Sequence, residues 1–271
     1  KGVTTQTRRH SYLVSLLGIR HVVLAVNKMD LVEYARTTFA AIEDEYRAFA
    51  KQIGLGDICC IPVSALKGDN ILTPSDKTRW YEGPTMMGYL ETVEVDHARL
   101  ERAPFRMPVQ WVNRPHADFR GFAGIVTSGT IQTGDRIRVQ PSGRESRVAR
   151  LVAYEGDLTQ AVPGQSITIT LTDEIDVSRG DVISSANAPA GVADQFEATL
   201  VWMSDQPMLP GRPYWLKIGA KTVTATITHL KYRVDVNRLE HLAAKRLDLN
   251  EIGVCNVAVD RPVAFDPYKE N

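Results

Sequence analysis

The residues of this sequence best suited to specific chemistry are four consecutive ones, Asn27, Lys28, Met29 and Asp30. The carboxylate of Asp30 can accept two hydrogen bonds at once, from the ring N1–H and the exocyclic amino group of guanine. Adenine offers no such pair of donors at that edge. The Asn27 amide can donate to N7 and tie neighbouring loops together, and the Lys28 stem can lie across the base. The pattern predicts a guanine-binding loop, although Asn and Asp also favour ordinary turns.

The four residues directly follow an apolar run at residues 22–26. An unbroken apolar run of this length is typical of a strand buried on both faces, as in a parallel sheet. We expect this strand over residues 21–26, after a helix over residues 6–17 that Gly18 closes. Polar residues at the carboxyl end of such a strand lie where open α/β sheets bind ligands.

A second apolar run at residues 58–63 is followed by Ser64, Ala65 and Leu66. Between the two runs, residues 35–53 carry apolar side chains at helical spacing, and Gly54 stands where a helix ends. The order predicts a βαβ unit with both strand ends occupied by small or polar residues. In guanine-nucleotide-binding domains a Ser-Ala-Leu or Ser-Ala-Lys loop offers a backbone N–H to guanine O6. The predicted base contacts are Asn27, Lys28, Met29, Asp30, Ser64, Ala65 and Leu66.

The segments that hold phosphates in such domains are missing from these 271 residues. We find no G-x-x-x-x-G-K-[S/T] loop, and no Asp-x-x-Gly segment before the first strand. A complete nucleotide-binding domain needs about 150 residues or more. We therefore expect residues 1–93 to be the C-terminal half of a GTP-binding domain, with no catalytic residue and no metal ligand in this chain.

Composition narrows the class of protein. Lys plus Arg equals Asp plus Glu at 32 each, so no bulk charge favours nucleic acid or an acidic membrane, and we expect neither as a partner. No stretch approaches 18 uninterrupted apolar residues. The three cysteines, Cys59, Cys60 and Cys255, show no metal-ligand spacing. We expect Cys59 and Cys60 to be buried, unreactive thiols in a core strand, in a reducing cytoplasm.

The rest of the chain has the pattern of two β domains. A helix beginning at Pro84, with Met86 and Met87 in its core face, is expected to lead into a charged linker at residues 94–104. Short β-rich runs separated by turn residues predict a closed β-barrel over residues 105–187. A second linker at residues 184–192 precedes residues 193–271, which we expect to form a β-barrel short of its closing strands. The expected strands cover residues 107–112, 124–127, 136–139, 148–154, 166–171, 181–183, 196–203, 214–218, 223–232 and 254–259.

The predicted fold is thus multidomain, a partial α/β GTPase domain followed by two small β-barrels. This order resembles the translational GTPase superfamily, which contains elongation factor Tu, and residues 124–131 look like its second-domain signature. Five further segments are similar to the GTPase (large) subunit of bacterial sulfate adenylyltransferase, and the resemblance runs along essentially the whole chain. These segments are residues 17–23, 80–85, 105–115, 118–124 and 217–223.

The resemblance implies an activity. That family forms adenosine 5′-phosphosulfate and pyrophosphate from ATP and sulfate, and GTP hydrolysis drives the adenylyl transfer. The transfer site belongs to a separate small subunit, and some bacteria carry a fused C-terminal adenylylsulfate kinase. The resemblance assigns Asn27, Lys28 and Asp30 to guanine, with the Ser64–Leu66 loop beside them. It places the phosphate-binding Lys, the Mg²⁺ ligands and the water-positioning His before Lys1, so that GTP and Mg²⁺ are the implied cofactors.

Two other classes remain open at this point. A translation elongation factor shares the architecture, and would bind aminoacyl-tRNA through its barrels. Residues 80–85 and 119–124 argue against it. A non-catalytic docking fragment is the other alternative, and the missing phosphate loop favours it for the 271 residues taken alone.

Overall fold

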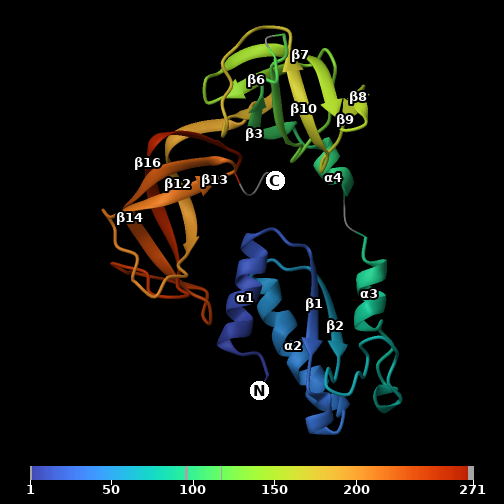
Figure 1. Cartoon of the computed structure of the whole chain (residues 1–271). Coiled ribbons are helices and arrows are strands. Elements are labelled where there is room, and N and C mark those ends of the chain that lie inside the picture. Colours follow the sequence, from blue (N-terminus) through green and yellow to red (C-terminus); the bar gives the residue numbers. More distant parts are fainter. Residues whose placement is uncertain (1, 95–96, 117, 268–271) are drawn as a thin grey trace. The chain divides into compact units, whose positions relative to one another are not determined.

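The computed structural model describes residues 2–94, 97–116 and 118–267. The chain divides into two compact units (Figure 1). The first comprises Lys1–Val95 with Val236–Glu240, and the second comprises Asp96–Asp235 with His241–Asn271. Each unit is described below by itself.

The first unit is built on two parallel strands with a helix between them. Helix α1 (Thr5–Leu16) precedes β1 (His21–Val26), and α2 (Arg36–Gln52) connects β1 to β2 (Asp57–Pro62). The two strands pair in parallel, with Val22 opposite Ile58 and Val26 opposite Pro62 (Figure 1). The predicted βαβ unit is therefore confirmed. Because the strands run in parallel and in register, their carboxyl ends lie at the same edge.

Helix ends and core contacts fix this unit in place. Thr4 caps α1 through a reciprocal contact with Thr7, and Gly18 takes a left-handed conformation just after the helix, as expected. The core joins α2 to both strands, and the hydroxyls of Ser11 and Tyr46 lie 2.9 Å apart between the two helices. The fully or nearly buried apolar residues of this core are Val26, Met29, Phe39, Tyr46, Ala50, Leu55, Ile58 and Cys60.

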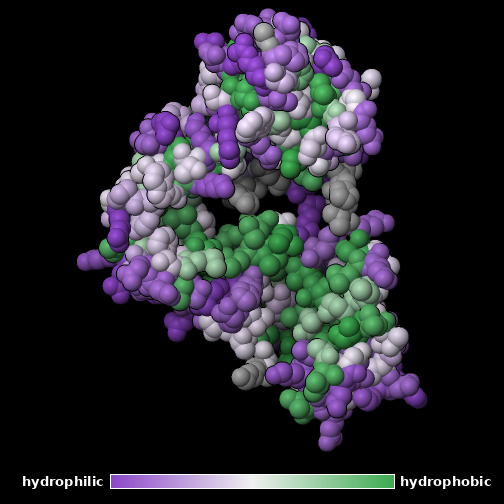
Figure 2. All heavy atoms as spheres, viewed as in Figure 1, coloured by the Kyte–Doolittle hydropathy of each residue, from purple (hydrophilic) through white to green (hydrophobic). Residues whose placement is uncertain are grey.

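The expectation that the first strand is buried on both faces is wrong. Most of β1 is half-buried, and Ala25 is exposed. Among the described residues β1 pairs with β2 alone, so its other edge has no strand beside it. Large apolar side chains are also exposed in this unit, among them Leu17 and Ile19, and Figure 2 shows apolar residues at its surface.

The segment after β2 also departs from expectation. It contains the short helix η2 (Asp76–Thr78) and then α3 (Met86–Thr92), whose residues are all at least partly exposed. Met87 is 42% exposed, so the prediction that the Met pair forms a helix core is wrong. The predicted linker holds a further helix, α4 (His97–Arg102), and residues 95–96 lie outside the described part. No helix in the described ranges is long and apolar enough to span a membrane.

The second unit contains the predicted closed β-barrel. Its strands follow one another in the order β10-β4-β3-β11-β6-β7, and β10 also pairs with β7, which closes the ring. Met107, Val109, Ile137, Leu151 and Ile169 are fully buried inside it. The six strands are β3 (Arg106–Asn113), β4 (Gly121–Ile125), β6 (Arg136–Gln140), β7 (Arg144–Ala153), β10 (Ser166–Leu171) and β11 (Val182–Ser185). Three short strands not expected from the sequence are β5 (Ile131–Gln132), β8 (Gly156–Leu158) and β9 (Gln160–Ala161).

A second, antiparallel sheet has the order β12-β16-β14-β13, with β15 beside β14. Among the described residues no pairing connects β12 to β13, so this sheet is open. Its own core contains Met208, Leu247 and Cys255, each fully buried. The strands are β12 (Gly191–Val201), β13 (Pro213–Ile218), β14 (Lys221–Asp235), β15 (Glu240–Leu242) and β16 (Ile252–Phe265).

Burial of the cysteines leads to a testable difference in thiol reactivity. Burial raises the pKa of the Cys60 thiol to about 12 and that of Cys255 to about 11. Because the thiolate is the reactive form, we expect both to resist Ellman's reagent at pH 8 in the folded protein, with the half-buried Cys59 reacting first. All three should react in denaturant. Rapid modification of Cys60 or Cys255 without denaturant would contradict this.

Candidate functional site

The two predicted base loops begin side by side at the ends of β1 and β2. The backbone pairing of the strands continues past their ends, because the Val63 N–H donates to the Val26 carbonyl at 2.9 Å. The Met29 N–H then donates to the Val63 carbonyl at 3.1 Å. These two bonds fix the distance between the two backbone segments just where the polar residues start.

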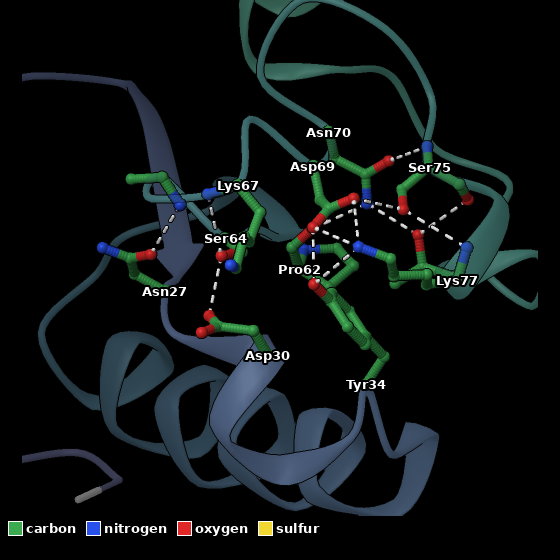
Figure 3. A network of polar contacts seen from close by, with 12 residues as sticks. Asn27, Asp30, Tyr34, Pro62, Ser64, Lys67, Asp69, Asn70, Ser75 and Lys77 are labelled. Carbon is green, nitrogen blue, oxygen red and sulfur yellow. Dashed lines mark hydrogen bonds and ion pairs between the residues drawn. The ribbon is translucent and has the colours of Figure 1, made fainter.

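Two side chains link the loops directly. The side-chain oxygen of Asn27, Oδ1, accepts from the backbone N–H of Lys28 at 2.7 Å and from the backbone N–H of Ala65 at 3.0 Å. The buried Ser64 hydroxyl donates to Asp30 Oδ1 at 2.7 Å (Figure 3). The bond from Ser64 orients the Asp30 carboxylate, because it fixes one of the two oxygens. The structure thus joins Asn27 and Asp30 of the first loop to Ala65 and Ser64 of the second.

Several residues of the two loops are exposed at the surface of this unit. Asn27, Lys28, Ala65 and Leu66 are all exposed, and the Leu66 side chain is 84% exposed. Lys28 takes a left-handed backbone conformation, with φ 67°, just before the short helix η1 (Met29–Val32) that carries Asp30. The sequence predicts that the second loop offers a backbone N–H to guanine O6. The Ala65 N–H of this loop donates to Asn27 Oδ1 in this structure, so a base bound to it would share or replace that bond.

Met29 is corrected by the structure. Its side chain is 1% exposed and belongs to the core with Phe39 and Tyr46. A side chain inside the core cannot contact a base at the loop surface, so the Met29 side chain is not a base contact. Its role is to anchor the loop, through the core and through its backbone bond to Val63.

A polar network beside the loops was missed by the sequence analysis. The Tyr34 hydroxyl donates to Asp69 Oδ2 at 2.5 Å, and the Ser75 hydroxyl donates to Asp69 Oδ1 at 2.7 Å (Figure 3). The Lys77 ammonium lies 3.4 Å from the same carboxylate. The bond from Tyr34 is the main cause that holds the pKa of Asp69 below its usual value, and the same bond raises the pKa of Tyr34. The turn-forming residues 68–70, directly after the second loop, were the available signal.

The described residues offer no metal centre to this site. In the part of the chain that the structure describes, no three His, Cys, Asp or Glu side chains lie close enough together to hold an ion. One oriented carboxylate, one amide and two exposed backbone turns lie at the edge of the parallel strand pair, and these hydrogen-bonding groups suit recognition of a polar ligand.

Comparisons with protein-family models agree with the two β domains. Residues 123–184 match the model of elongation factor Tu domain 2. Residues 195–271 match the model of the GTP-eEF1A C-terminal domain-like family.

Similar curated proteins cover the whole chain. The chain is 52% identical over 271 residues to "Bifunctional enzyme CysN/CysC" of Xylella fastidiosa. The alignment covers all of this chain and 43% of that protein. The chain is 50% identical over 270 residues to "Sulfate adenylyltransferase subunit 1" of Aeromonas hydrophila, and this alignment covers 57% of that protein. The chain thus spans about half the length of the curated relatives that it matches.

Solved structures show the fold of the chain. A crystal structure of sup35 complexed with GMPPNP aligns with 98% of this chain and 67% of its own, with a TM-score of 0.58 and 20% identity. A sup35 structure with GDP aligns over the same shares, with a TM-score of 0.59. The chain is thus about half identical along its whole length to proteins named sulfate adenylyltransferase subunit 1 and CysN/CysC, and it has the fold of sup35.

Proposed function

We propose that this chain supplies the guanine-reading loops and the β domains of a sulfate adenylyltransferase GTPase subunit. In this function, GTP hydrolysis drives formation of adenosine 5′-phosphosulfate and pyrophosphate from ATP and sulfate. The observation that carries the proposal is the Ser64–Asp30 and Asn27–Ala65 linkage at one strand edge. It occurs in a chain half identical throughout to a protein named sulfate adenylyltransferase subunit 1.

Three polar side chains of the first loop have distinct roles in this function. Asp30 Oδ2, which has no hydrogen-bond partner among the described residues, accepts from the guanine amino group, and Oδ1 accepts from N1–H while Ser64 holds it. The Asn27 amide nitrogen donates to N7, and the Lys28 stem covers one face of the base. These contacts favour guanine because adenine carries no donor pair at that edge.

The remaining chemistry requires groups other than these loops. Triphosphate binding needs backbone N–H groups and a Lys, and Mg²⁺ needs oxygen ligands. We assign the adenylyl transfer to a small partner subunit. The relative named as a bifunctional enzyme supports an adenylylsulfate kinase as a fused or associated activity. Cytoplasmic localisation follows from the substrates of such a pathway step and remains part of this proposal.

The function is tested with a chimera in which these 271 residues replace the aligned 270 residues of the Aeromonas hydrophila subunit 1. The chimera is mixed with the small subunit, ATP, sulfate and GTP, and pyrophosphate and GDP are followed over time. We expect sulfate-dependent product formation that requires GTP, with the unaltered subunit as control. GTP hydrolysis that responds to ribosomes, and not to sulfate or the small subunit, would instead assign the chain to the elongation factors.

The 271-residue chain by itself should bind GTP only weakly. Its sequence contains the base-reading loops and no phosphate loop, so the triphosphate lacks the backbone N–H groups and the Lys that hold it. Isothermal titration with GTP and Mg²⁺ measures this affinity. We expect a dissociation constant above about 100 μM, because a few base contacts alone contribute little net free energy. A micromolar constant would contradict the expectation.

A further inference from the structure

We propose that Tyr34 and Asp69 are positioning residues that hold Asp30 in the geometry that selects guanine. The inference rests on the proposed guanine site and extends it to two side chains that touch no base. They complete a closed circuit of contacts that starts and ends at Asp30.

The first part of the circuit fixes Tyr34 relative to Asp30. Tyr34 stands four residues after Asp30, at the end of the turn formed by η1, and its N–H donates to the Met29 carbonyl at 2.9 Å. The Trp80 indole donates to the Tyr34 carbonyl at 3.1 Å. Tyr34 also has a left-handed backbone, with φ 55°, which side-chain-bearing residues adopt only where their surroundings hold them. The aromatic ring of Tyr34 therefore projects from the turn in a fixed direction.

The second part is the Asp69 carboxylate. It accepts from the Tyr34 hydroxyl and the Ser75 hydroxyl, and the Lys77 ammonium lies beside it and over the Tyr34 ring, 5.0 Å from the ring centre. The Asp69 side chain is only 12% exposed. Three donors on one nearly buried carboxylate leave it little freedom to rotate.

The third part returns from Asp69 to Asp30 through Ser64. The backbones of Ser64 and Asp69 exchange two hydrogen bonds, at 3.3 Å and 3.2 Å, and the Ser64 hydroxyl donates to Asp30. Asp30, Tyr34, Asp69 and Ser64 thus form a closed ring of covalent and hydrogen-bonded links between the two loops (Figure 3).

The buried side-chain amide of Asn70 links this circuit of contacts to the end of β2. Asn70 is 2% exposed, and its amide nitrogen donates to the Pro62 carbonyl at 2.7 Å and to the Thr78 hydroxyl at 2.8 Å. Its carbonyl oxygen accepts from the Ser75 N–H at 2.8 Å. Because Asn70 ties both Pro62 and Ser75, the group that holds Asp69 is fixed to the strand itself.

The circuit of contacts affects base selection because guanine is recognised only when the Asp30 oxygens are correctly positioned. The two oxygens of Asp30 must meet two donors of the base at hydrogen-bond distances, and Ser64 alone is a single pivot. The Tyr34–Asp69 hydrogen bond adds a further link between the loops, besides the Ser64–Asp30 and Asn27–Ala65 contacts. Opening that link should loosen the Asn27–Ala65 and Ser64–Asp30 contacts without removing any group that binds the base.

Amide hydrogen exchange on the 271-residue chain tests the circuit without any ligand. We expect the Lys28 and Ala65 amides, which both donate to Asn27, to exchange about three- to tenfold faster in Tyr34→Phe. Exchange at Ile61, inside β2, should not change. The matched control is Tyr81→Phe, which removes a hydroxyl of the same unit that donates to the Pro84 carbonyl. Unchanged exchange at Lys28 and Ala65 in Tyr34→Phe would overturn the proposal.

Nucleotide-binding measurements distinguish a failure of the positioning role of Tyr34 and Asp69 from a failure of the guanine site itself. In the chimera described above, we expect Tyr34→Phe and Asp69→Ala to lower the ratio of GDP to XDP affinity about three- to tenfold. A structural defect alone would weaken both nucleotides equally and leave the ratio unchanged, which would overturn the positioning role. If the parent chimera shows no preference for GDP over XDP, the guanine site itself fails, whatever the exchange data show.

Discussion

The Asp30→Asn variant of the chimera should bind GDP about ten- to a hundredfold more weakly than the parent and should prefer XDP. In the structure Ser64 donates to Asp30 Oδ1, so an Asn side chain at this position keeps its oxygen toward Ser64. Its amide group then faces the guanine donors, and a buried donor is left unpaired. Xanthine carries a carbonyl in place of the amino group and can accept from that amide.

Competition titration with fluorescent GDP, followed by displacement with GDP and XDP, measures this change. Asp44→Asn is the matched control, because Asp44 is an exposed carboxylate on α2. It should leave both affinities within about twofold of the parent. Equal GDP binding by Asp30→Asn and the parent would show that Asp30 does not read the base.

The base loops could be predicted because their signal is local. Two apolar runs with polar residues at their ends, joined by a helical pattern, determine a parallel pair and bring Asn27 and Ala65 to one edge. Tyr34 and Asp69 could not be found in this way, since their contact joins positions 35 residues apart that have no common motif. Met29 was misassigned because a four-residue motif does not show which side chain turns into the core.

The β domains were predicted where runs were long and missed where they were short. β10 was expected at residues 166–171 and is found there, because its alternating pattern fills one face with Ile167 and Ile169. β5 and β9 have two residues each, which is too short for any periodicity to be recognised. Helix α4 was read as linker because half of its residues are charged, and charge alone does not distinguish an exposed helix from a loop.

Two glycines explain why the second-domain signature can be recognised. A Cβ on Gly124 would lie 2.4 Å from the Pro108 carbonyl oxygen, so β4 could not pair with β3 as closely as it does. A Cβ on Gly129 would lie 2.4 Å from the Phe105 backbone nitrogen, and its φ of 67° also favours glycine. The signature therefore reflects two places where the barrel backbone allows no side chain.

Within the second unit, Asp266→Ala should lower the free energy of unfolding by about 2–4 kcal/mol. The Asp266 carboxylate forms a paired contact with the Arg106 guanidinium, at 2.7 Å and 2.9 Å. Arg106 is 8% exposed and also donates to the carbonyls of Phe105 and Ala188. Removing the carboxylate leaves a buried positive charge with neutral acceptors only. The resulting loss of stability exceeds the net stabilisation that the ion pair itself provides.

Urea unfolding in a Trp80→Phe background isolates this effect, because the other three tryptophans, Trp111, Trp202 and Trp215, all belong to the second unit. The control is Asp176→Ala, since the Asp176 side chain is 87% exposed and lies 3.8 Å from Arg120 and 4.0 Å from Arg144. It should change the free energy by less than about 0.5 kcal/mol. Replacing Arg106 by Met together with Asp266→Leu should recover much of the loss, because an apolar pair leaves no buried charge. Equal effects of Asp266→Ala and Asp176→Ala would show that burial of the Arg106 contact adds nothing to its strength.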